Sequence, residues 1–325
     1  MALNEQDETL AVKAAELYYE ADKTQDEIGA ALGVSRWKVG RLLSAARAHG
    51  FVRIEIIHPS ARRLALEREL CGFYDLDDAI VVPTPESDQS VTMRVAEAAA
   101  DYLTALRPVP RTLGVSWGRT LHAVAGQLRP GWAVGVNTVQ INGSVSSTRQ
   151  ATAAADTAAV IARKAGGSAT LLPSPAIFEY VATRRAVEAD RAVQSVLEIA
   201  RGANAYLFGA GIVDASSVHV DSGYLSREDV DTLAAHGAVG DVLGRFITSG
   251  GVIADPELDS RTLGMSLDDL RRARVSIAVI AGEAKHRIAH AVVANGLCTV
   301  LITDESTAHD LLGHVSLPQQ SPWKE

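Results

Sequence analysis

Residues 24–53, TQDEIGAALGVSRWKVGRLLSAARAHGFVR, have the pattern of two short helices joined by a tight turn. Thr24 is a typical N-cap, and Glu27 three residues later completes a capping box. Gly33 supplies the left-handed residue that ends the first helix, and Ser35 caps the second. The stretch therefore predicts a helix-turn-helix.

The second helix, expected to run to about His49, has two different faces. Its inward stripe is apolar and consists of Val39, Leu42, Leu43 and Ala46. Its outward positions are mainly polar or basic: Arg36, Trp37, Lys38, Gly40, Arg41 and Ser44. Residues 36–53 include no acidic residue, although the chain has a formal net charge of -8. A local cationic face on an acidic protein can neutralise DNA phosphates while the rest of the surface repels them.

Positions on the two helices predict which residues contact DNA. The start of a recognition helix reaches base edges, and the N-terminus of the preceding helix suits a phosphate. The predicted DNA-binding residues are Thr24, Gln25, Ser35, Arg36, Trp37, Lys38 and Arg41. The alternative is an ordinary surface hairpin with solvated arginines, but the turn, the caps and the basic face coincide. Trp37 by itself is ambiguous, because it could equally pack against the following domain.

The composition of the whole chain narrows the classes of protein. Its 325 residues suffice for two domains, and 47% hydrophobic with 22% charged residues is typical of globular proteins. The two cysteines, Cys71 and Cys298, argue against a disulfide framework or a metal cluster and suit a reducing cytoplasm. No signal peptide and no apolar run of about 18 residues is present, so we expect no membrane span. We expect no cofactor.

Three segments surround the helix pair. A helix over residues 7–22 would complete a three-helix head, and residues 51–57, FVRIEII, alternate as a short strand or wing. A helix from Ser60 to about Cys71 would link head and body and could pair two subunits. The predicted domains are residues 1–58 (DNA binding), 59–72 (linker helix) and 73–317 (effector binding and oligomerisation).

Beyond Gly72 the sequence alternates between strand and helix patterns, which predicts an α/β fold with an open, mostly parallel sheet. The expected strands are residues 79–82, 112–115, 134–141, 169–172, 205–208, 275–280 and 299–302. The expected helices are residues 90–106, 118–128, 151–165 and one running from Pro175 to Arg201.

Ligands of such sheets bind beyond the carboxyl ends of the strands, where this chain has glycine-rich and polar loops. These loops are Gly114–Val124, Gln140–Thr148, Leu171–Glu179 and Phe208–Asp214. In the first, Gly118, Arg119 and Thr120 begin a helix, so free amides, a cation and a hydroxyl could hold a phosphate. One glycine loop is a weak signal, but four at equivalent positions favour a polyhydroxylated anionic ligand.

Two charged residues further along could complete such a site. Asp241, within GAVGDVLGRF, could accept hydrogen bonds from sugar hydroxyls, and Lys285, within GEAKHRIAH, could neutralise a phosphate. The alternative is a helix-capping aspartate and a surface lysine. The residues alone favour neither interpretation.

Several motifs in order resemble the SorC family of bacterial transcriptional regulators. They are LYYEADKTQDEIGAALGVSRWKVGRLLSAARAHGFVRIEI, GVSWGRTL, VQINGSV, GAVGDVLGRF and GEAKHRIAHAVVANGLCTVLITDESTAHDLL. The resemblance covers nearly the whole chain. It implies a winged helix-turn-helix joined to a sugar-binding domain related to the sugar-phosphate isomerase fold. It also implies a cytoplasmic dimer or tetramer whose binding to double-stranded operator DNA is altered by a carbohydrate, usually phosphorylated.

The family's ligand residues can be matched to this sequence motif by motif. Its phosphate loop falls on Ser116, Trp117, Gly118, Arg119 and Thr120, its second ligand loop on Gln140, Asn142 and Gly143, and its charged contacts on Asp241 and Lys285. Ser116 stands where glycine is common, and Ser144 replaces the second glycine of the usual Asn-Gly-Gly. An unphosphorylated pentitol or hexitol therefore stays open as the ligand.

Two functions from different classes follow. The first is a transcription factor of carbohydrate metabolism that responds to a sugar, a polyol or a sugar phosphate. The alternative is a sugar-phosphate isomerase-like enzyme with an appended DNA-binding head, for which Asp241, Glu179 and Asp214 are nominal bases. His286 and His290 lie one helical turn apart but lack a third ligand, so we expect no metal site.

Overall fold

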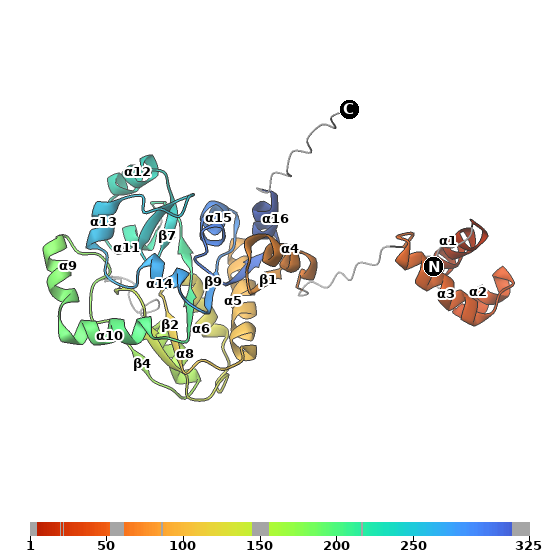
Figure 1. Ribbon diagram of the computed structural model, residues 1–325, viewed down its shortest axis with the longest axis horizontal. Helices are drawn as coiled ribbons and strands as arrows, with labels where there is room; N and C mark the ends of the chain where they lie inside the picture. The colour runs from red at the N-terminus through yellow and green to blue at the C-terminus, as the bar shows by residue number, and fades with distance from the viewer. Residues whose placement is uncertain are drawn as a thin grey trace, which may run out of the picture. The chain divides into compact units, whose positions relative to one another are not determined.

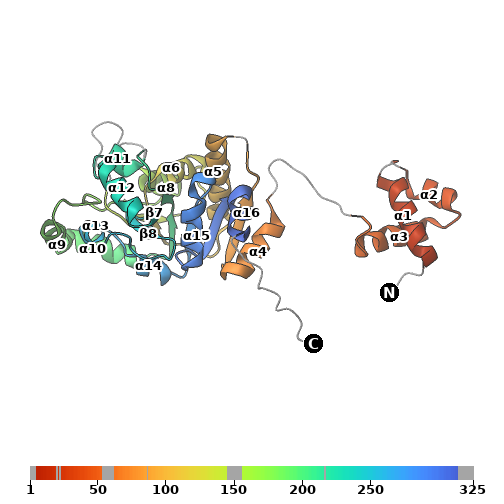
Figure 2. The ribbon, with the colours of Figure 1, turned by 90° about the horizontal axis from the view of Figure 1, so that it is seen from above.

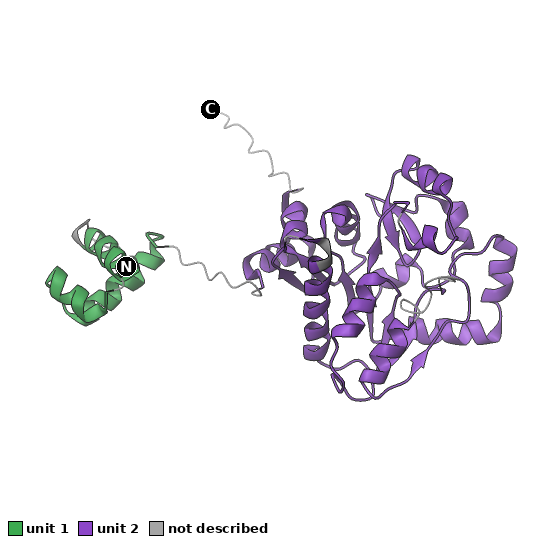
Figure 3. Ribbon diagram, turned by 180° about the vertical axis from the view of Figure 1, so that it is seen from behind, with its two compact units in different colours: residues 1–59 green, residues 60–325 purple. Residues whose placement is uncertain are grey.

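The computed structural model of the chain describes residues 5–19, 21, 23–52, 62–85, 87–144, 156–215 and 217–313. The chain consists of two compact units (Figures 1 and 3). The N-terminal unit spans residues 1–59, and the C-terminal unit spans residues 60–325.

The described part of the N-terminal unit contains three helices, α1 (Glu5–Tyr19), α2 (Gln25–Leu32) and α3 (Arg36–Ala48). Buried apolar side chains from all three form its core: Ala11, Ala14, Ala15, Ile28, Val39, Leu42, Leu43 and Ala46. The predicted inward stripe of α3 is thereby confirmed, as is the opening helix. The predicted wing at residues 51–57 falls mainly on residues 53–57, which lie outside the described part of the chain.

The turn between α2 and α3 follows from local chemistry. Thr24 and Glu27 form the predicted capping box, and Ser35 Oγ accepts a hydrogen bond from Lys38 N at 3.2 Å. Gly33 ends α2 in the left-handed region, at φ 67°. A Cβ on Gly29 would approach the backbone oxygen of Val34 to 2.8 Å, so glycine lets the turn fold back against α2.

The C-terminal unit is built around the predicted parallel sheet, which has seven strands in the order β1-β10-β9-β5-β2-β3-β4. Every neighbouring pair in it is parallel. The strands are β1 (Asp78–Val82), β2 (Thr112–Val115), β3 (Asn137–Gln140), β4 (Ala169–Thr170), β5 (Ala205–Phe208), β9 (Ser276–Val279) and β10 (Val300–Asp304). Their carboxyl ends meet at one edge of the unit, as a ligand site in such a fold requires.

Helices cover both faces of this sheet, so successive strand residues are buried on opposite sides. Ile80 and Leu207 pack toward α5 (Asp88–Ala105), α6 (Arg119–Gln127) and α8 (Thr157–Lys164). Val81 and Phe208 pack toward the opposite helices, including α4 (Leu64–Tyr74), α15 (His286–Ala294) and α16 (Glu305–Gly313). Figure 2 shows these two helix layers on either side of the sheet.

A second, antiparallel sheet of three strands was not predicted from the sequence. It consists of β6 (Ala210–Gly211), β7 (Ala238–Val242) and β8 (Arg245–Thr248). Asp241 lies on β7, so the interpretation of this residue as a helix cap is wrong. Small residues such as Gly211 and Gly240 let the strands approach closely, and they also conceal the strand pattern in the sequence.

The remaining helices differ from expectation in detail. The helix predicted from Pro175 to Arg201 is two helices, α9 (Val181–Glu188) and α10 (Arg191–Arg201), because Asp190 caps a new helix through Ala192 N. The helix expected to link the units begins at Leu64 and packs against β1 and α16 (Figures 1 and 2). The other helical elements are α11 (Val218–Asp221), α12 (Arg227–Ala235), α13 (Pro256–Arg261), α14 (Leu267–Arg271) and the short 3-10 helix η1 (Glu283–Lys285).

Candidate functional site

A cavity of about 620 Å³ lies in the C-terminal unit beyond the carboxyl ends of β2, β5 and β9. Most of the sequence-predicted effector residues line it: Ser116, Trp117, Gly118, Arg119, Thr120, Asn142, Asp241 and Lys285. The cavity is also bounded by Gly209, Gly211 and Gly244, and its size suits a small molecule. The fold thus brings together residues that are up to 169 positions apart, from Ser116 to Lys285.

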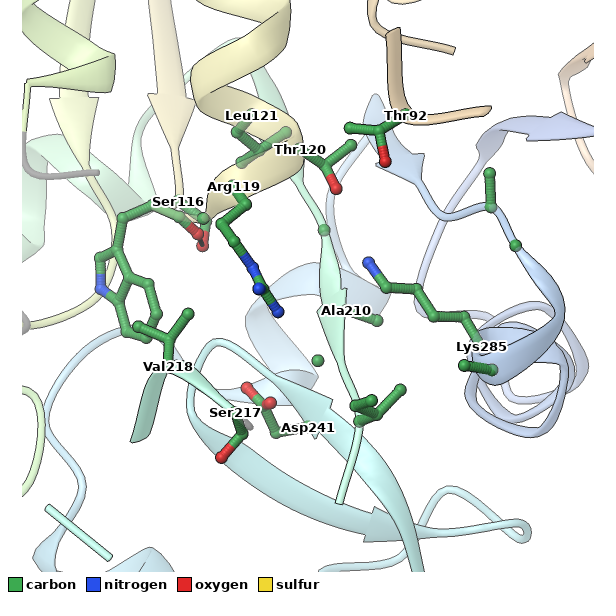
Figure 4. A pocket seen from close by; sticks show the side chains of 18 of the residues that line it. Thr92, Ser116, Arg119, Thr120, Leu121, Ala210, Ser217, Val218, Asp241 and Lys285 are labelled. Atoms are coloured by element: carbon green, nitrogen blue, oxygen red, sulfur yellow. Dashed lines mark hydrogen bonds between the residues drawn. The ribbon is translucent and has the colours of Figure 1, made fainter. Parts of the chain in front are cut away.

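Two cationic side chains reach into the cavity from different walls. Arg119 begins α6, and the preceding Gly118 makes no side-chain cap, so the first amides of the helix are available to an anion. Figure 4 shows Arg119 extending from α6 and Lys285 from the opposite wall into the same space. Neither side chain makes a hydrogen bond or an ion pair with the residues that the structure describes. Two cations that reach into one cavity are an arrangement suited to an anion.

The environment of Lys285 has a measurable electrostatic consequence. Burial, and then the positive charge of Arg119, lower the pKa of Lys285 to about 8, while the negative charge of Asp241 opposes them. A bound anion would stabilise the charged form of this lysine. The cavity is therefore expected to bind anions better when Lys285 is protonated.

Asp241 supplies the acidic side of the cavity (Figure 4). Its carboxylate is buried, and Oδ2 accepts a hydrogen bond from Gly244 N at 3.0 Å. A Cβ on Gly211 would collide with Oδ1, so the close approach of β6 to β7 at this carboxylate requires glycine. A carboxylate accepts hydrogen bonds but cannot donate them, which matches the hydroxyl groups of a carbohydrate.

Sequence reasoning missed His219, which also lines the cavity. Its side chain is buried, and Nε2 lies 3.3 Å from Asp241 Oδ2. Trp117 and Phe246 pack against the imidazole ring at centroid distances of 5.5 and 5.3 Å. No local motif marks this histidine, because its role comes from contacts with strands that follow it in the chain.

Three buried polar atoms of cavity-lining residues have no hydrogen-bond partner among the described residues. They are Asn142 Oδ1, Ser217 Oγ and His219 Nδ1. A buried polar group without a partner costs free energy, so proteins rarely leave such groups unsatisfied. Their concentration around one cavity supports a polar ligand there.

Two predicted effector residues, Gln140 and Gly143, do not line the cavity. Gln140 Nε2 donates to Asn142 O at 2.9 Å and to Ser144 Oγ at 3.2 Å, which shapes the loop that presents Asn142. Gly143 O accepts a hydrogen bond of 2.7 Å from Trp117 Nε1 and so fixes the indole in the cavity wall. Both residues support cavity-lining neighbours. Residues 145–148 of the same predicted loop lie outside the described part of the chain.

The predicted DNA-binding residues lie at the N-termini of α2 and α3 in the other unit. Arg36, Trp37, Lys38 and Arg41 are exposed, and 75% of the Trp37 surface is accessible. The Arg41 guanidinium lies over the Trp37 ring, 5.6 Å from its centroid. Arg36 pairs with Asp26 at 3.5 Å and Lys38 with Asp7 at 3.1 Å, but such surface pairs are weak and leave both cations able to reach another anion.

The caps explain the other members of this group. The Thr24 hydroxyl donates to Glu27 Oε2 at 2.8 Å, and Ser35 caps α3, so both side chains are occupied by the helix ends. Gln25 Oε1 lies 3.6 Å from the position of a Cβ on Gly40, which places its amide beside α3. A basic and aromatic surface on the first turns of one helix is the geometry that reads a DNA groove.

No group of histidine, cysteine and carboxylate side chains suitable for a metal ion occurs within the described ranges. Among the helices of the described residues, none is long and apolar enough to cross a membrane.

Comparison with known proteins identifies the family. A family model described as "Putative sugar-binding domain" matches residues 58–313. The deoxyribonucleoside regulator of Bacillus subtilis (strain 168) is 32% identical, over 95% of this chain and 99% of the relative. The full-length sorbitol operon regulator SorC from Klebsiella pneumoniae has a crystal structure that matches with a TM-score of 0.71 and 27% identity, covering 95% of this chain and 100% of that one. The chain belongs to the SorC family.

The family assignment confirms the resemblance seen in the sequence and adds relatives with different names. The erythritol catabolism regulatory protein EryD of Brucella abortus (strain 2308) is 30% identical over 94% of this chain and 97% of the relative. These relatives are named as regulators of different pathways. This SorC-family chain is a transcriptional regulator that carries a sugar-binding domain.

Proposed function

We propose that this regulator binds operator DNA through α2 and α3, as a winged helix-turn-helix, and that a carbohydrate in the cavity changes its affinity for DNA. The observation that carries the proposal is the cavity itself, where Arg119, Lys285 and Asp241 face one space (Figure 4). A site that combines two cations with a hydrogen-bond acceptor matches a sugar phosphate. A sugar or polyol without phosphate would use the Asp241 side alone.

On the DNA side, α3 is the recognition helix. Arg36, Lys38 and Arg41 supply positive charge at its exposed start, and Trp37 offers an apolar surface next to them. Gln25 and the N-terminus of α2 would hold a neighbouring phosphate. One such helix reads few base pairs, so the operator-binding form is proposed to be a dimer or tetramer of this chain with two recognition helices. Such a regulator acts on chromosomal DNA, which places it in the cytoplasm.

On the ligand side, the phosphate is proposed to bind at the amides of α6 together with Arg119, Thr120 and Lys285. Ser116, Trp117, Gly118 and Asn142 complete the wall, while Gln140 and Gly143 support it from behind. The parallel sheet with loops at its carboxyl edge supports the relation to sugar-phosphate isomerases that the resemblance implies. The ligand can shift DNA binding only through different affinities for two arrangements of the protein.

An enzyme is the second candidate, and the positions of its nominal bases argue against it. Glu179 and Asp214 do not line the cavity. Asp241 does, but its Oδ2 is already engaged by Gly244 N and faces His219. We therefore propose binding without turnover. If the wild type isomerised a sugar phosphate and the Asp241→Asn variant did not, the enzyme hypothesis would be supported instead.

Two measurements test the proposal. Selection from a random duplex library should return a preferred sequence, and Arg36→Ala with Arg41→Ala should abolish the selection. A thermal-shift screen of sugars, polyols and their phosphates should then raise the unfolding midpoint with at least one compound. That compound should change the affinity for the selected DNA. The proposal would be contradicted if the protein selected no DNA sequence. It would also be contradicted if none of the screened compounds changed the affinity for DNA.

A further inference from the structure

The carboxylate of Asp241 is held from one side only. Gly244 N donates to Oδ2 at 3.0 Å, and His219 Nε2 lies 3.3 Å from the same oxygen. Leu243 and Gly244, with φ of 58° and 81°, form the tight turn between β7 and β8 that brings the Gly244 amide to the carboxylate. Both of these contacts therefore involve Oδ2, and neither involves the other carboxylate oxygen.

The second oxygen, Oδ1, lies on the side of Gly211. The glycine is needed there because a Cβ would collide with Oδ1. Among the described residues, no hydrogen-bond donor contacts Oδ1, although Asp241 lines the cavity. Oδ1 is thus the acceptor that remains for a hydroxyl group of a ligand.

The imidazole of His219 cannot easily turn away from Asp241. Only 2% of its surface is exposed, and the rings of Trp117 and Phe246 contact it at interplanar angles of 67° and 58°. Trp117 is itself fixed by its hydrogen bond to Gly143 O. When Nε2 carries the proton, the imidazole presents a donor to Asp241 Oδ2, 3.3 Å away, and Nδ1, which has no partner in the described part of the chain, is left as an acceptor.

We propose that His219 is a positioning residue for ligand recognition, an inference that rests on the proposed function. It holds the Asp241 carboxylate so that Oδ1 accepts a hydrogen bond from a ligand hydroxyl. The phosphate is proposed to bind at Arg119 and Lys285, which line the same cavity as Asp241. His219 therefore determines the preference for a hydroxylated phosphate over inorganic phosphate, without contributing to the affinity for the phosphate group.

The geometry gives three variants different expected results. His219→Gln keeps an amide donor near the position of Nε2 and should keep the preference. His219→Asn is one methylene shorter and cannot reach Asp241, and His219→Phe keeps the aromatic contacts but has no donor. Both should lose the preference by roughly tenfold, the usual effect of losing a hydrogen bond to a charged group. His236→Phe, at an exposed histidine, is the matched control.

The experiment is calorimetric titration of the full chain with inorganic phosphate, glycerol phosphate, erythritol phosphate and sorbitol phosphate. For the wild type, His219→Gln and His236→Phe, we expect at least one hydroxylated phosphate to bind more tightly than inorganic phosphate. For His219→Asn and His219→Phe, we expect inorganic phosphate to bind within about twofold of the wild type while that advantage disappears. If His219→Phe fails to fold, the Gln and Asn pair decides the question.

Each other outcome overturns the proposal. Equal loss of all phosphates in His219→Asn would make His219 a purely structural residue, and an unchanged preference would show that Asp241 needs no positioning. A wild type that binds inorganic phosphate but prefers no hydroxylated phosphate would refute the positioning role and leave the anion site intact. A wild type that binds no phosphate at all would refute the proposed phosphate site as well.

Discussion

The exposed start of α3 and the cavity of the C-terminal unit use the same basic chemistry on surfaces of different shape. Arg36 and Lys38 lie on the surface, with side chains 70% and 47% exposed and weak pairs to nearby acids. Arg119 and Lys285 line a cavity, have no acidic partner among the described residues, and the pKa of Lys285 is lowered to about 8. Cations spread along an exposed helix suit a long polyanion whose counterions are released, whereas cations that converge on a cavity suit one small anion held by geometry. The two regions should therefore respond differently to salt, substitution and pH.

Salt should separate the two regions most strongly. If two copies of α3 bring Arg36, Lys38 and Arg41 to phosphates, raising salt from about 50 to 200 mM should weaken DNA binding roughly a thousandfold. Binding of a sugar phosphate in the cavity should change less than about tenfold, because one small anion contacts fewer cations and releases fewer counterions than a DNA duplex does. Fluorescence anisotropy for DNA and calorimetry for the ligand measure both. If DNA affinity and ligand affinity fell equally with salt, the proposed difference between the two regions would be wrong.

Substitution of one cation of the cavity should affect ligand binding alone. Arg119→Ala removes the cation at the start of α6, so affinity for glycerol phosphate should fall by about 10- to 100-fold. DNA affinity without ligand should stay within about twofold. Arg129→Ala, at an exposed arginine just beyond α6, is the control and should change neither affinity. An Arg119→Ala variant with unchanged ligand affinity would place the anion elsewhere.

The pH dependence of ligand binding should come from Lys285. Its pKa is about 8 because burial and Arg119 disfavour its charge, and a bound anion favours that charge. Affinity for glycerol phosphate should therefore be highest below pH 8 and fall about fivefold to tenfold between about pH 7 and 9.5. The phosphate monoester keeps its double charge over most of that range.

Lys285→Met should bind more weakly at neutral pH and show no such fall. Lys13→Met, at an exposed lysine of the N-terminal unit, should behave like the wild type. A wild-type affinity that stays constant through pH 8 would show that Lys285 does not contact the anion.

A buried carboxylate behind the cavity should give the smallest effect, and on stability only. Burial by itself would raise the pKa of Asp304, but hydrogen bonds donated by Thr307, Gly282 and Thr84 lower it below its usual value. A lowered pKa in the folded state gives stability that is present above about pH 4, the unfolded value, and is lost as pH falls below it. Asp304→Asn should cost about 2 kcal/mol at pH 7.

Denaturant unfolding at pH 7 and near pH 3 checks this prediction. The difference between wild type and Asp304→Asn should shrink at the lower pH. Asp268→Asn, at a carboxylate that is 67% exposed, should change stability little at either pH. A constant difference at both pH values would mean that the charge of Asp304 does not stabilise the fold.

Local signals explain which parts of the fold could be predicted. The capping box at Thr24 and the left-handed Gly33 act within a few residues, so the ends of α2 and α3 were predicted closely. Continuous apolar runs gave the buried parallel strands. The strands β6 and β7 were missed, because Ala210–Gly211 and AVGDV carry little of the apolar alternation that marks a strand. The break at Asp190 does have a local signal, because aspartate is a common N-cap. The helical pattern on both sides of it nevertheless predicts one continuous helix.

Some residues of the candidate site could likewise be predicted from local sequence signals, and others could not. Gly118 and Arg119 belong to a loop whose position after a strand predicts an anion site. Asp241 and Lys285 give no clear signal by themselves. They are predicted as ligand contacts because they match positions in the family's motifs. His219 and Ser217 lie on and beside a helix of four residues with no motif, and only the folding of β7 brings Asp241 to that histidine.

The most direct test of the central claim is reciprocity between the two regions. Ligand affinity is measured with and without the selected DNA, and DNA affinity with and without the ligand, at one salt concentration and one pH. If the cavity controls DNA binding, both ratios must equal the same factor, and coupling of this kind is typically about 5- to 150-fold. Factors of one in both titrations, with ligand and DNA both bound, would contradict the account.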